Sequence, residues 1–144
     1  MINWGKTMEL KYDNEISVKD YNKLRDEVKW GAIPDEQAAI GLSNSAYVVA
    51  CKDGERTIAA ARVMWDGGYA AYICDVMVSP EYQRMGIGST IINKIMDYLK
   101  SQLKSGWKIM ITLVSSQGKE AFYEKFGFEK RPNDYLGNGM SMWI

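Results

Sequence analysis

Residues 83–88 have the residue types of an anion-binding loop. They read QRMGIG and lie between an apolar run that ends at Val78 and an amphipathic segment that begins at Ile87. A helix N-terminus leaves about four main-chain N–H groups without partners and carries roughly half a positive charge. Glycines at 86 and 88 would let the backbone approach a phosphate without a side-chain clash. The pattern therefore predicts an anion cradle at the start of a helix.

The neighbouring residues add donors and exclude the commonest phosphate motifs. Ser89 and Thr90 supply hydroxyl groups, and Arg84 supplies a cation. A P-loop needs Gly-Lys-Ser/Thr, but Gly88 is followed by Ser89. A dinucleotide fingerprint needs a third Gly or Ala at position 91, which is Ile. Taken alone, the loop could still be an ordinary strand-to-helix turn.

The composition excludes several other classes. The 144 residues hold 18 Lys+Arg and 18 Asp+Glu, which favours neither a nucleic acid nor an anionic membrane as partner. No apolar run approaches the ~20 residues that span a bilayer, and residues 1–10 lack the pattern of a secretory signal, so a cytoplasmic location is expected. The absence of His removes the usual general base and every Ser-His or Cys-His pair. Cys51 and Cys74 are too few for a disulfide framework or a zinc site.

The elements that position the loop predict one α+β domain over residues 1–144. Short turns at 53–54 and 66–68 separate three β-rich runs, which predicts an antiparallel meander. A crossover over residues 70–114 then gives a mixed, largely antiparallel sheet with a central β-α-β unit and helices on both faces. We expect strands over 8–12, 46–52, 57–65, 69–78 and 139–144, a buried central strand over 107–114 and a further strand after Gly127-Phe128. Helices are expected from a Ser17 cap to Trp30-Gly31, from Pro34 to about Leu42, from Ile87 to Ser105-Gly106, and over 117–125.

Residues 70–130 resemble the GNAT superfamily of N-acetyltransferases. Gln83, Gly86 and Gly88 fill the fixed positions of the family's acetyl-CoA loop, Gln/Arg-x-x-Gly-x-Gly/Ala. Residues 76–82 (VMVSPEY) match the strand and turn that precede it, and residues 121–128 (AFYEKFGF) are similar to the family's Tyr-Glu-Lys-x-Gly-Phe block. Two motifs in the right order and spacing are far more specific than either alone.

The resemblance implies acetyl-CoA as the cofactor. Backbone amides of residues 84–89 would hold the pyrophosphate, and the strand end at 76–78 would bind the pantetheine arm as an added strand does. An amide N–H near Val78 would polarise the thioester carbonyl and stabilise the developing oxyanion. Many members carry an Asn where this chain has Ser116, so the Asn bond to the cofactor arm must come from Ser116 or be absent. The expected cofactor-binding residues are Val76, Met77, Val78, Gln83, Arg84, Met85, Gly86, Ile87, Gly88, Ser89, Thr90, Ser116 and Tyr123.

Tyr123 matches the tyrosine that lies near the thioester sulfur in many members. A phenol of pKa ~10 can protonate a departing thiolate whose thiol pKa is ~8.5. The alternative for Tyr123 is a core aromatic beside Phe122 and Phe126.

Asp75 is the candidate general base, because a carboxylate inside an apolar strand must be satisfied in some way. A structural Asp that bonds a loop amide is the alternative. Strand alternation predicts that Asp75 shares a face with Ile73 and Met77, unless a bulge at Val76-Met77 changes the parity; the opposite face would hold Tyr72, Cys74, Val76 and Val78. Cys74 could accept an acetyl group, but an inert core thiol is the favoured reading without a His to activate it.

These residues predict an N-acetyltransferase that moves an acetyl group to a primary amine by direct attack in a ternary complex. The alternative is an acyl-CoA-binding regulatory or partner-binding module without catalysis. Aromatic residues would line the acceptor side and favour a small aryl-alkyl or aliphatic amine; they are Trp30, Trp65, Tyr69 and Tyr72, with Tyr135 and Asn138 near the closing hairpin. For Trp30 a core position is nevertheless the favoured reading. Arg62 and Trp65 could face a ligand, but solvent or sheet-face positions are the favoured reading for both. Dimerisation through the last strand is common in such folds.

Overall fold

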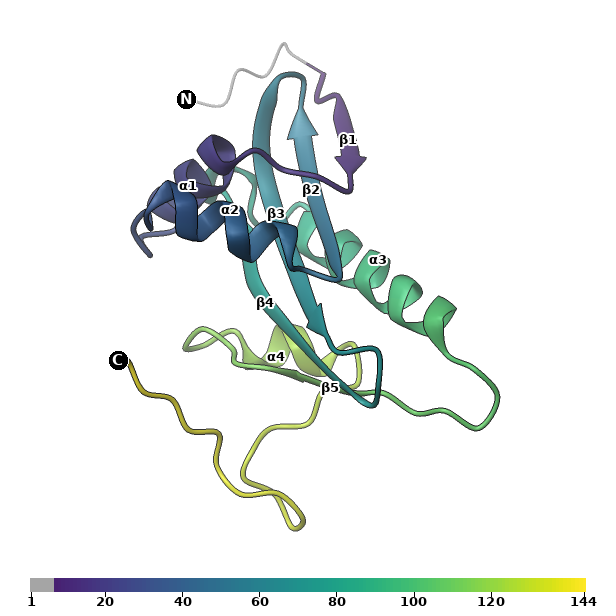
Figure 1. The fold of residues 1–144 in the computed structure, drawn as a ribbon. Helices are drawn as coiled ribbons and strands as arrows, with labels where there is room; N and C mark the ends of the chain where they lie inside the picture. Colours follow the sequence, from purple (N-terminus) through teal and green to yellow (C-terminus); the bar gives the residue numbers. More distant parts are fainter. Residues whose placement is uncertain (1–6) are drawn as a thin grey trace. The chain divides into compact units, whose positions relative to one another are not determined.

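Five strands form one sheet in the order β1-β2-β3-β4-β5 (Figure 1). The structure is a computed structural model that describes residues 7–144. The expectation that no secretory signal is present rests in part on residues 1–6, which lie outside the described residues. By contacts the chain divides into a first unit that ends at Thr112 and a second unit over Leu113–Ile144, so the single domain expected over residues 1–144 stays a prediction.

The predicted antiparallel meander is confirmed. Each of the first three strands pairs antiparallel with the next one along the chain, so β1 to β4 form the meander. Two residues separate β2 from β3, and Gly54 there has a φ of +58°, a conformation that glycine adopts without steric cost. The strands are β1 (Leu10–Asp13), β2 (Tyr47–Asp53), β3 (Arg56–Trp65) and β4 (Ala70–Val78), and β5 (Met110–Leu113) follows β4 in the sheet order.

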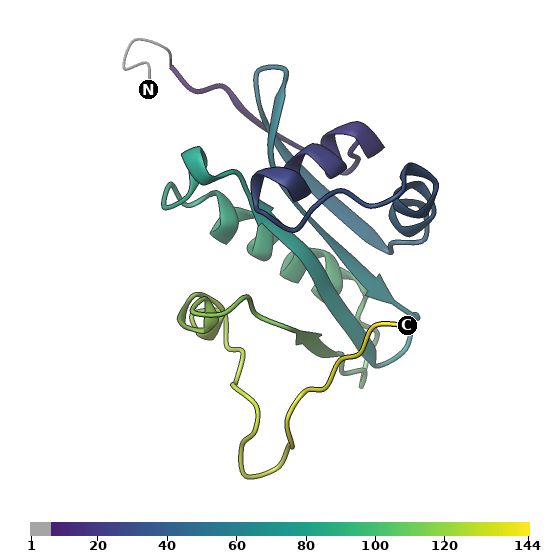
Figure 2. The same ribbon diagram turned by 90° about the vertical axis from the view of Figure 1, so that its left-hand side faces the viewer.

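Helices cover both faces of the meander, as expected. In Figures 1 and 2, α1 (Val18–Glu27) and α2 (Asp35–Ser43) lie over one face and α3 (Ile87–Gln102) lies over the other. The Ser17 hydroxyl caps α1 by accepting a 3.0 Å hydrogen bond from the amide of Asp20. The apolar stripe of α3 is buried against the sheet and consists of Ile87, Ile91, Ile92, Ile95 and Leu99. The opposite core contains Tyr21, Leu24, Ala38, Ala50, Ala60 and Met77.

The expected end of α3 and the expected strand after it are both wrong in extent. The helix ends at Gln102, before Ser105-Gly106, because Leu103 already has extended backbone angles. The amide of Trp107 bonds to the carbonyl of Lys104 in a turn, so the first residues of the apolar run are not part of a strand. β5 is therefore short, it stands last in the sheet order, and Met110 is half exposed. The apolar run over residues 107–114 predicted a central strand, but a central position also needs a neighbouring strand on each side, and β5 stands at the end of the sheet order.

The two strands expected near the C-terminus are also wrong. A short helix, α4 (Glu120–Glu124), is present, but residues 127–144, all of them described, contain no helix or strand. The side chain of Asn133 instead accepts hydrogen bonds from the amides of Tyr135 and Leu136 at 2.9 Å, which forms a local turn. The alternating pattern of residues 139–144 predicted a strand, but alternation cannot supply the neighbouring strand that its backbone groups need.

Candidate cofactor and catalytic site

The loop before α3 presents an open set of main-chain donors. Arg84 and Gly86 adopt left-handed backbone angles, with φ of +62° and +80°, and Gly86 caps the helix N-terminus. None of the described residues accepts a hydrogen bond from the amides of residues 84–89. The first turn of α3 also contains no acidic residue. Because unpaired N–H groups and the helix dipole both favour negative charge, this loop fits a phosphate group.

Three residues of the loop have more specific positions. The side-chain amide of Gln83 donates a 3.1 Å hydrogen bond to the carbonyl of Val78, which joins the loop to the end of β4. The hydroxyl of Thr90 donates to the carbonyl of Gly86 at 3.1 Å, so its proton is used within the helix. The side chain of Ile87 is buried, so only its main-chain groups could contact an anion at this loop.

An arginine that sequence reasoning did not single out supports the turn before the loop. Arg56 bonds to Glu81 at 3.1 Å and to the hydroxyl of Ser79 at 3.2 Å, and its guanidinium lies 5.4 Å from the ring centre of Tyr82. Glu27, at the end of α1, lies 3.5 Å from the same guanidinium. These partners come from distant parts of the chain, so no local pattern could have revealed the cluster. It fixes the short 3₁₀ helix η1 (Pro80–Tyr82) against α1 and β3.

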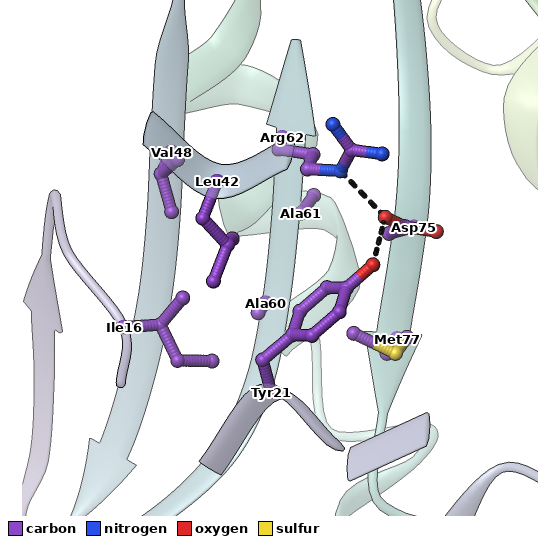
Figure 3. Close-up of a pocket in the computed structure, with 9 residues that line it drawn as sticks. All are labelled: Ile16, Tyr21, Leu42, Val48, Ala60, Ala61, Arg62, Asp75 and Met77. Atoms are coloured by element: carbon purple, nitrogen blue, oxygen red, sulfur yellow. Dashed lines mark hydrogen bonds and ion pairs between the residues drawn. The ribbon is translucent and has the colours of Figure 1, made fainter. Parts of the chain in front are cut away.

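Asp75 is held by three side chains on the face that α1 and α2 cover. The Nε of Arg62 and the hydroxyl of Tyr21 each donate a 2.6 Å hydrogen bond to Oδ2 of Asp75 (Figure 3). Arg25 donates to Oδ1 at 3.5 Å. The side chain of Asp75 is only 15% exposed. The alternative expected for Asp75 was a structural carboxylate bonded to a loop amide. The structure shows side chains as its hydrogen-bond partners in place of that amide. The role of Asp75 as general base stays a prediction.

The predicted face of Asp75 is partly wrong, because β4 contains a bulge. Arg62 pairs with Cys74 and Ala60 pairs with Met77, so β4 has one residue more than β3 over this interval. Asp75 itself has a φ of +56°. Cys74 lies opposite Arg62 and therefore shares its face, as Asp75 and Met77 do, whereas Ile73 lies opposite Val63. The bulge begins at Asp75, one residue before the position considered from sequence.

A small pocket lies beside this network in the first unit. It is lined by Ile16, Tyr21, Leu42, Val48, Ala60, Ala61, Arg62, Asp75 and Met77 (Figure 3). Nearby, burial raises the pKa of the Cys74 thiol to about 11 and raises the pKa of Tyr72. Cys74 is therefore a protonated thiol at neutral pH, which argues against its use as an acetyl acceptor.

The aromatic residues expected on the acceptor side lie at different places in the first unit. Trp65 and Tyr69 flank the turn between β3 and β4, and the indole N–H of Trp65 donates to the carbonyl of Gly68 at 2.8 Å. Trp30 follows α1, is 42% exposed, and lies under the guanidinium of Arg25 at 5.9 Å. The core alternative for Trp30 is not what the structure shows.

The second unit contains Tyr123 and Ser116. Tyr123 lies in α4, and its ring contacts those of Phe122 and Phe128 edge to face, with centroids 5.0 and 6.2 Å away. Burial raises its pKa above the ordinary value of 10.0, and no described residue hydrogen-bonds its hydroxyl. Ser116 is exposed, and its carbonyl accepts from the amide of Lys119 at 3.0 Å. Tyr123 thus combines an aromatic setting with a protonated, unengaged phenol.

Two other kinds of site are not found among residues 7–144. There, no group of three or more His, Cys, Asp or Glu side chains is placed to hold a metal ion. No helix in that part of the chain has the length and apolar character that crossing a bilayer requires.

Comparison with known proteins gives one consistent family. The family model described as the acetyltransferase (GNAT) family matches residues 9–128. The chain is 29% identical over 136 residues to an uncharacterized N-acetyltransferase, ycf52, of Pyropia yezoensis, covering 92% of this chain and 76% of that protein. It is 31% identical over 144 residues to the chloroplastic GCN5-related N-acetyltransferase 2 of Arabidopsis thaliana, covering 85% of this chain and 54% of that protein. The crystal structure of a probable acetyltransferase, SA2161, of Staphylococcus aureus superimposes with a TM-score of 0.82 at 29% identity, covering 93% of this chain and all of the other.

Proposed function

Because the chain belongs to the acetyltransferase (GNAT) family, we propose that it transfers an acetyl group from acetyl-CoA to a primary amine of a small molecule. The observation that carries this proposal is the row of amides at residues 84–89 that have no acceptor among the described residues. Gln83, at the start of the same loop, links it to the end of β4 through its hydrogen bond to the carbonyl of Val78. A ligand that combines a pyrophosphate with an extended arm suits a donor loop joined to a strand end in this way.

The residues of the first unit would bind and polarise the cofactor. The amides of residues 84–89, with the Arg84 side chain and the hydroxyl of Ser89, would hold the pyrophosphate. Main-chain groups of residues 76–78 would bind the pantetheine arm, and the amide of Val78 would hydrogen-bond the thioester oxygen. Bound acetyl-CoA would supply an activated thioester for direct attack by the amine in a ternary complex.

Tyr123 would act as the general acid. Its raised pKa keeps the phenol protonated at neutral pH, so its O–H has a proton to give to the sulfur as the C–S bond breaks. The amine nitrogen forms the new bond to the acetyl carbon and loses one proton, which water relays to the Tyr123 phenolate, so that the phenol is restored. Ser116 would bond the cofactor arm in place of the Asn that many members carry.

The acceptor would be recognised by aromatic side chains. Trp30, Trp65, Tyr69 and Tyr72 present rings that suit an aryl-alkyl or aliphatic amine, with cation–π contact to its ammonium form. The cytoplasmic location expected from sequence stays a prediction, since one relative is named as chloroplastic. Homodimerisation also stays a prediction, although the strand expected over residues 139–144, through which it was to occur, is not formed in the structure.

Two measurements test this function together. Titration calorimetry should show that acetyl-CoA binds, and that removal of the pyrophosphate, in acetyl-pantetheine, abolishes most of the affinity. A thiol-release assay with acetyl-CoA and a panel of arylalkylamines, polyamines and amino acids should show turnover with at least one amine. Absence of both binding and turnover would overturn the proposal, and binding without turnover on any amine would point to an acyl-CoA-binding module.

A further inference from the structure

The bulge in β4 changes which main-chain groups face away from β3. In an extended strand, the N–H and C=O of one residue point to the same edge, and successive residues alternate between edges. The carbonyl of Tyr69 accepts a hydrogen bond from the amide of Met110 in β5, so before the bulge the odd-numbered residues face β5. After the bulge, the carbonyl of Val78 accepts from Gln83, whereas the amide of Ser79 bonds to Ile58 of β3. Even-numbered Val78 therefore faces the edge that odd-numbered residues face before the bulge.

The extra residue at Asp75 is what makes this switch. Between the pairs Arg62–Cys74 and Ala60–Met77, β3 advances by two residues and β4 by three. Without the extra residue, Val78 would point its N–H and C=O toward β3, and no amide of Val78 would be available to a thioester oxygen. The position of the proposed oxyanion donor thus depends on the bulge.

At the bulge Asp75 adopts left-handed backbone angles, and the hydrogen bonds of its side chain stabilise this conformation. A φ of +56° is uncommon for a residue with a side chain, although Asp and Asn adopt it more readily than most. Oδ2 of Asp75 accepts both 2.6 Å hydrogen bonds, from Arg62 on β3 and from Tyr21 on α1. Arg62 also donates to the carbonyl of Gly41 on α2 at 3.3 Å. One carboxylate oxygen therefore ties the bulge to a neighbouring strand and to both helices that cover it.

We propose that Asp75 is a positioning residue, held by Arg62 and Tyr21, that fixes the β4 bulge and thereby directs the amide of Val78 toward the acetyl group. This role rests on the proposed transferase function. It differs from that of a general base, which would need an oxygen free to take a proton from the amine. Both arginines and the tyrosine donate to this carboxylate, and Oδ2 accepts the two short bonds, so most of its roughly four lone-pair sites are already in use.

Substitutions at Asp75 separate the two roles. Asp75→Asn keeps an oxygen at the Oδ2 position and tolerates left-handed angles, so we expect kcat within about fivefold of the wild type. Asp75→Ala removes the acceptor of the Arg62 and Tyr21 hydrogen bonds and disfavours the left-handed backbone angles at this position. Its kcat should therefore fall by about 10²-fold. Asp75→Gly removes the side chain but permits the backbone, so its thermal stability and kcat should lie above those of Asp75→Ala. Acetyl-CoA affinity should be preserved in Asp75→Asn. In Asp75→Ala, where the groups of residues 76–78 would turn, the affinity should fall less than kcat does, because the 84–89 amides do not change.

Variants of the two residues that bond Asp75, and of a control position in α3, test the positioning role further. Tyr21→Phe and Arg62→Met should each lower kcat, although neither side chain would react with the amine. Asp97 lies on the exposed side of α3 and serves as a control position with helical backbone angles. There Asp97→Gly should be less stable than Asp97→Ala, the reverse of the order expected for Asp75→Gly and Asp75→Ala. A kcat for Asp75→Asn as low as that for Asp75→Ala, with Tyr21→Phe fully active, would overturn the positioning role and assign Asp75 as the base.

A readout that does not depend on turnover separates this proposal from the proposed function. In the wild type and in Asp75→Asn, the amide of Ser79, bonded to Ile58 at 2.8 Å, should be protected from hydrogen exchange. In Asp75→Ala that protection should be lost while the α3 amides stay protected. If Asp75→Ala keeps the protection of Ser79, the bulge does not depend on Asp75 and the proposal fails, whether or not an amine substrate has been found.

Discussion

The side-chain amide of Gln83 donates a 3.1 Å hydrogen bond to the carbonyl of Val78. This bond closes the turn over residues 79–82 between β4 and the candidate phosphate loop, and it satisfies a strand-end carbonyl that points away from β3. It thereby couples the two parts of the proposed cofactor site, the donor loop and the strand end.

Gln83→Ala should weaken acetyl-CoA binding by about fivefold, the value of one ordinary hydrogen bond. Free CoA should lose affinity to the same extent, because the loss concerns the loop and not the acetyl group. Calorimetric titration of both ligands measures this. Gln102→Ala is the matched control, since among residues 7–144 the Gln102 side chain donates only to the neighbouring Ser101 hydroxyl. Equal affinity of Gln83→Ala and wild type would contradict a role for this contact.

Gly86→Ala should cost about 1–2 kcal/mol in the free energy of unfolding, because a Cβ at a φ of +80° is strained even where space is open. It should also lower acetyl-CoA affinity, since relief of the strain would rotate the amides that open α3. Gly106→Ala provides a close control, with a φ of +79° and no atom within 4 Å of the added Cβ. Denaturant unfolding should show similar losses for both variants, whereas calorimetry should show weaker binding for Gly86→Ala alone. Equal binding by the two variants would argue against the loop as the phosphate site.

Tyr123→Phe should lower kcat by about 10²-fold or more and leave acetyl-CoA affinity unchanged, because the ring contacts with Phe122 and Phe128 remain and only the phenol proton is lost. Burial raises the pKa of Tyr123 above 10.0, so the phenol stays protonated through neutral pH. The wild-type kcat should therefore not decline on account of this group until the pH exceeds 10. A kcat–pH profile of both proteins measures this. Phe122→Leu serves as a packing control, and wild-type kcat in Tyr123→Phe would exclude the general-acid role.

Cys74 should behave as an inert buried thiol. With a pKa of about 11, roughly one Cys74 thiol in a thousand is ionised at pH 8, so an aromatic disulfide reagent should modify it slowly in the folded protein and rapidly after unfolding. Cys74→Ala should retain turnover, and no acetylated protein should be seen by mass spectrometry after incubation with acetyl-CoA alone. Loss of turnover in Cys74→Ala with normal acetyl-CoA binding would revive the covalent route.

The same thiol should make stability depend on pH in the alkaline range. Its pKa is raised from 9.0 to about 11 on folding, so between these values the unfolded chain has lost a proton that the folded chain retains. The contribution of Cys74 to the free energy of unfolding is therefore complete below pH 9 and is lost as the pH rises toward 11. Urea unfolding at several pH values should show a shallower decline for Cys74→Ala than for the wild type. Parallel declines would show that Cys74 is not the group responsible.

The sequence was informative wherever the signal is local. The Ser17 cap, the two short turns, the four-residue apolar period of α3 and the glycines at 86 and 88 each depend on residues a few positions apart, and the structure contains the corresponding elements. The same locality made the family recognisable from residues 76–88 and 121–128, whereas the phosphate-binding role of the loop stays a prediction.

Tertiary structure decided what depends on distant partners. The strand expected over residues 139–144 had the right alternation but has no partner strand within the described chain, and residues 107–114 form only the short β5. Asp75 stood out in the sequence as a carboxylate in an apolar strand, but its partners Arg62 and Tyr21 lie 13 and 54 positions away. Periodicity predicts which face a side chain occupies only while the strand stays regular. A single extra residue in β4 changed that parity, because hydrogen bonds to other elements stabilise a backbone conformation that local preference disfavours.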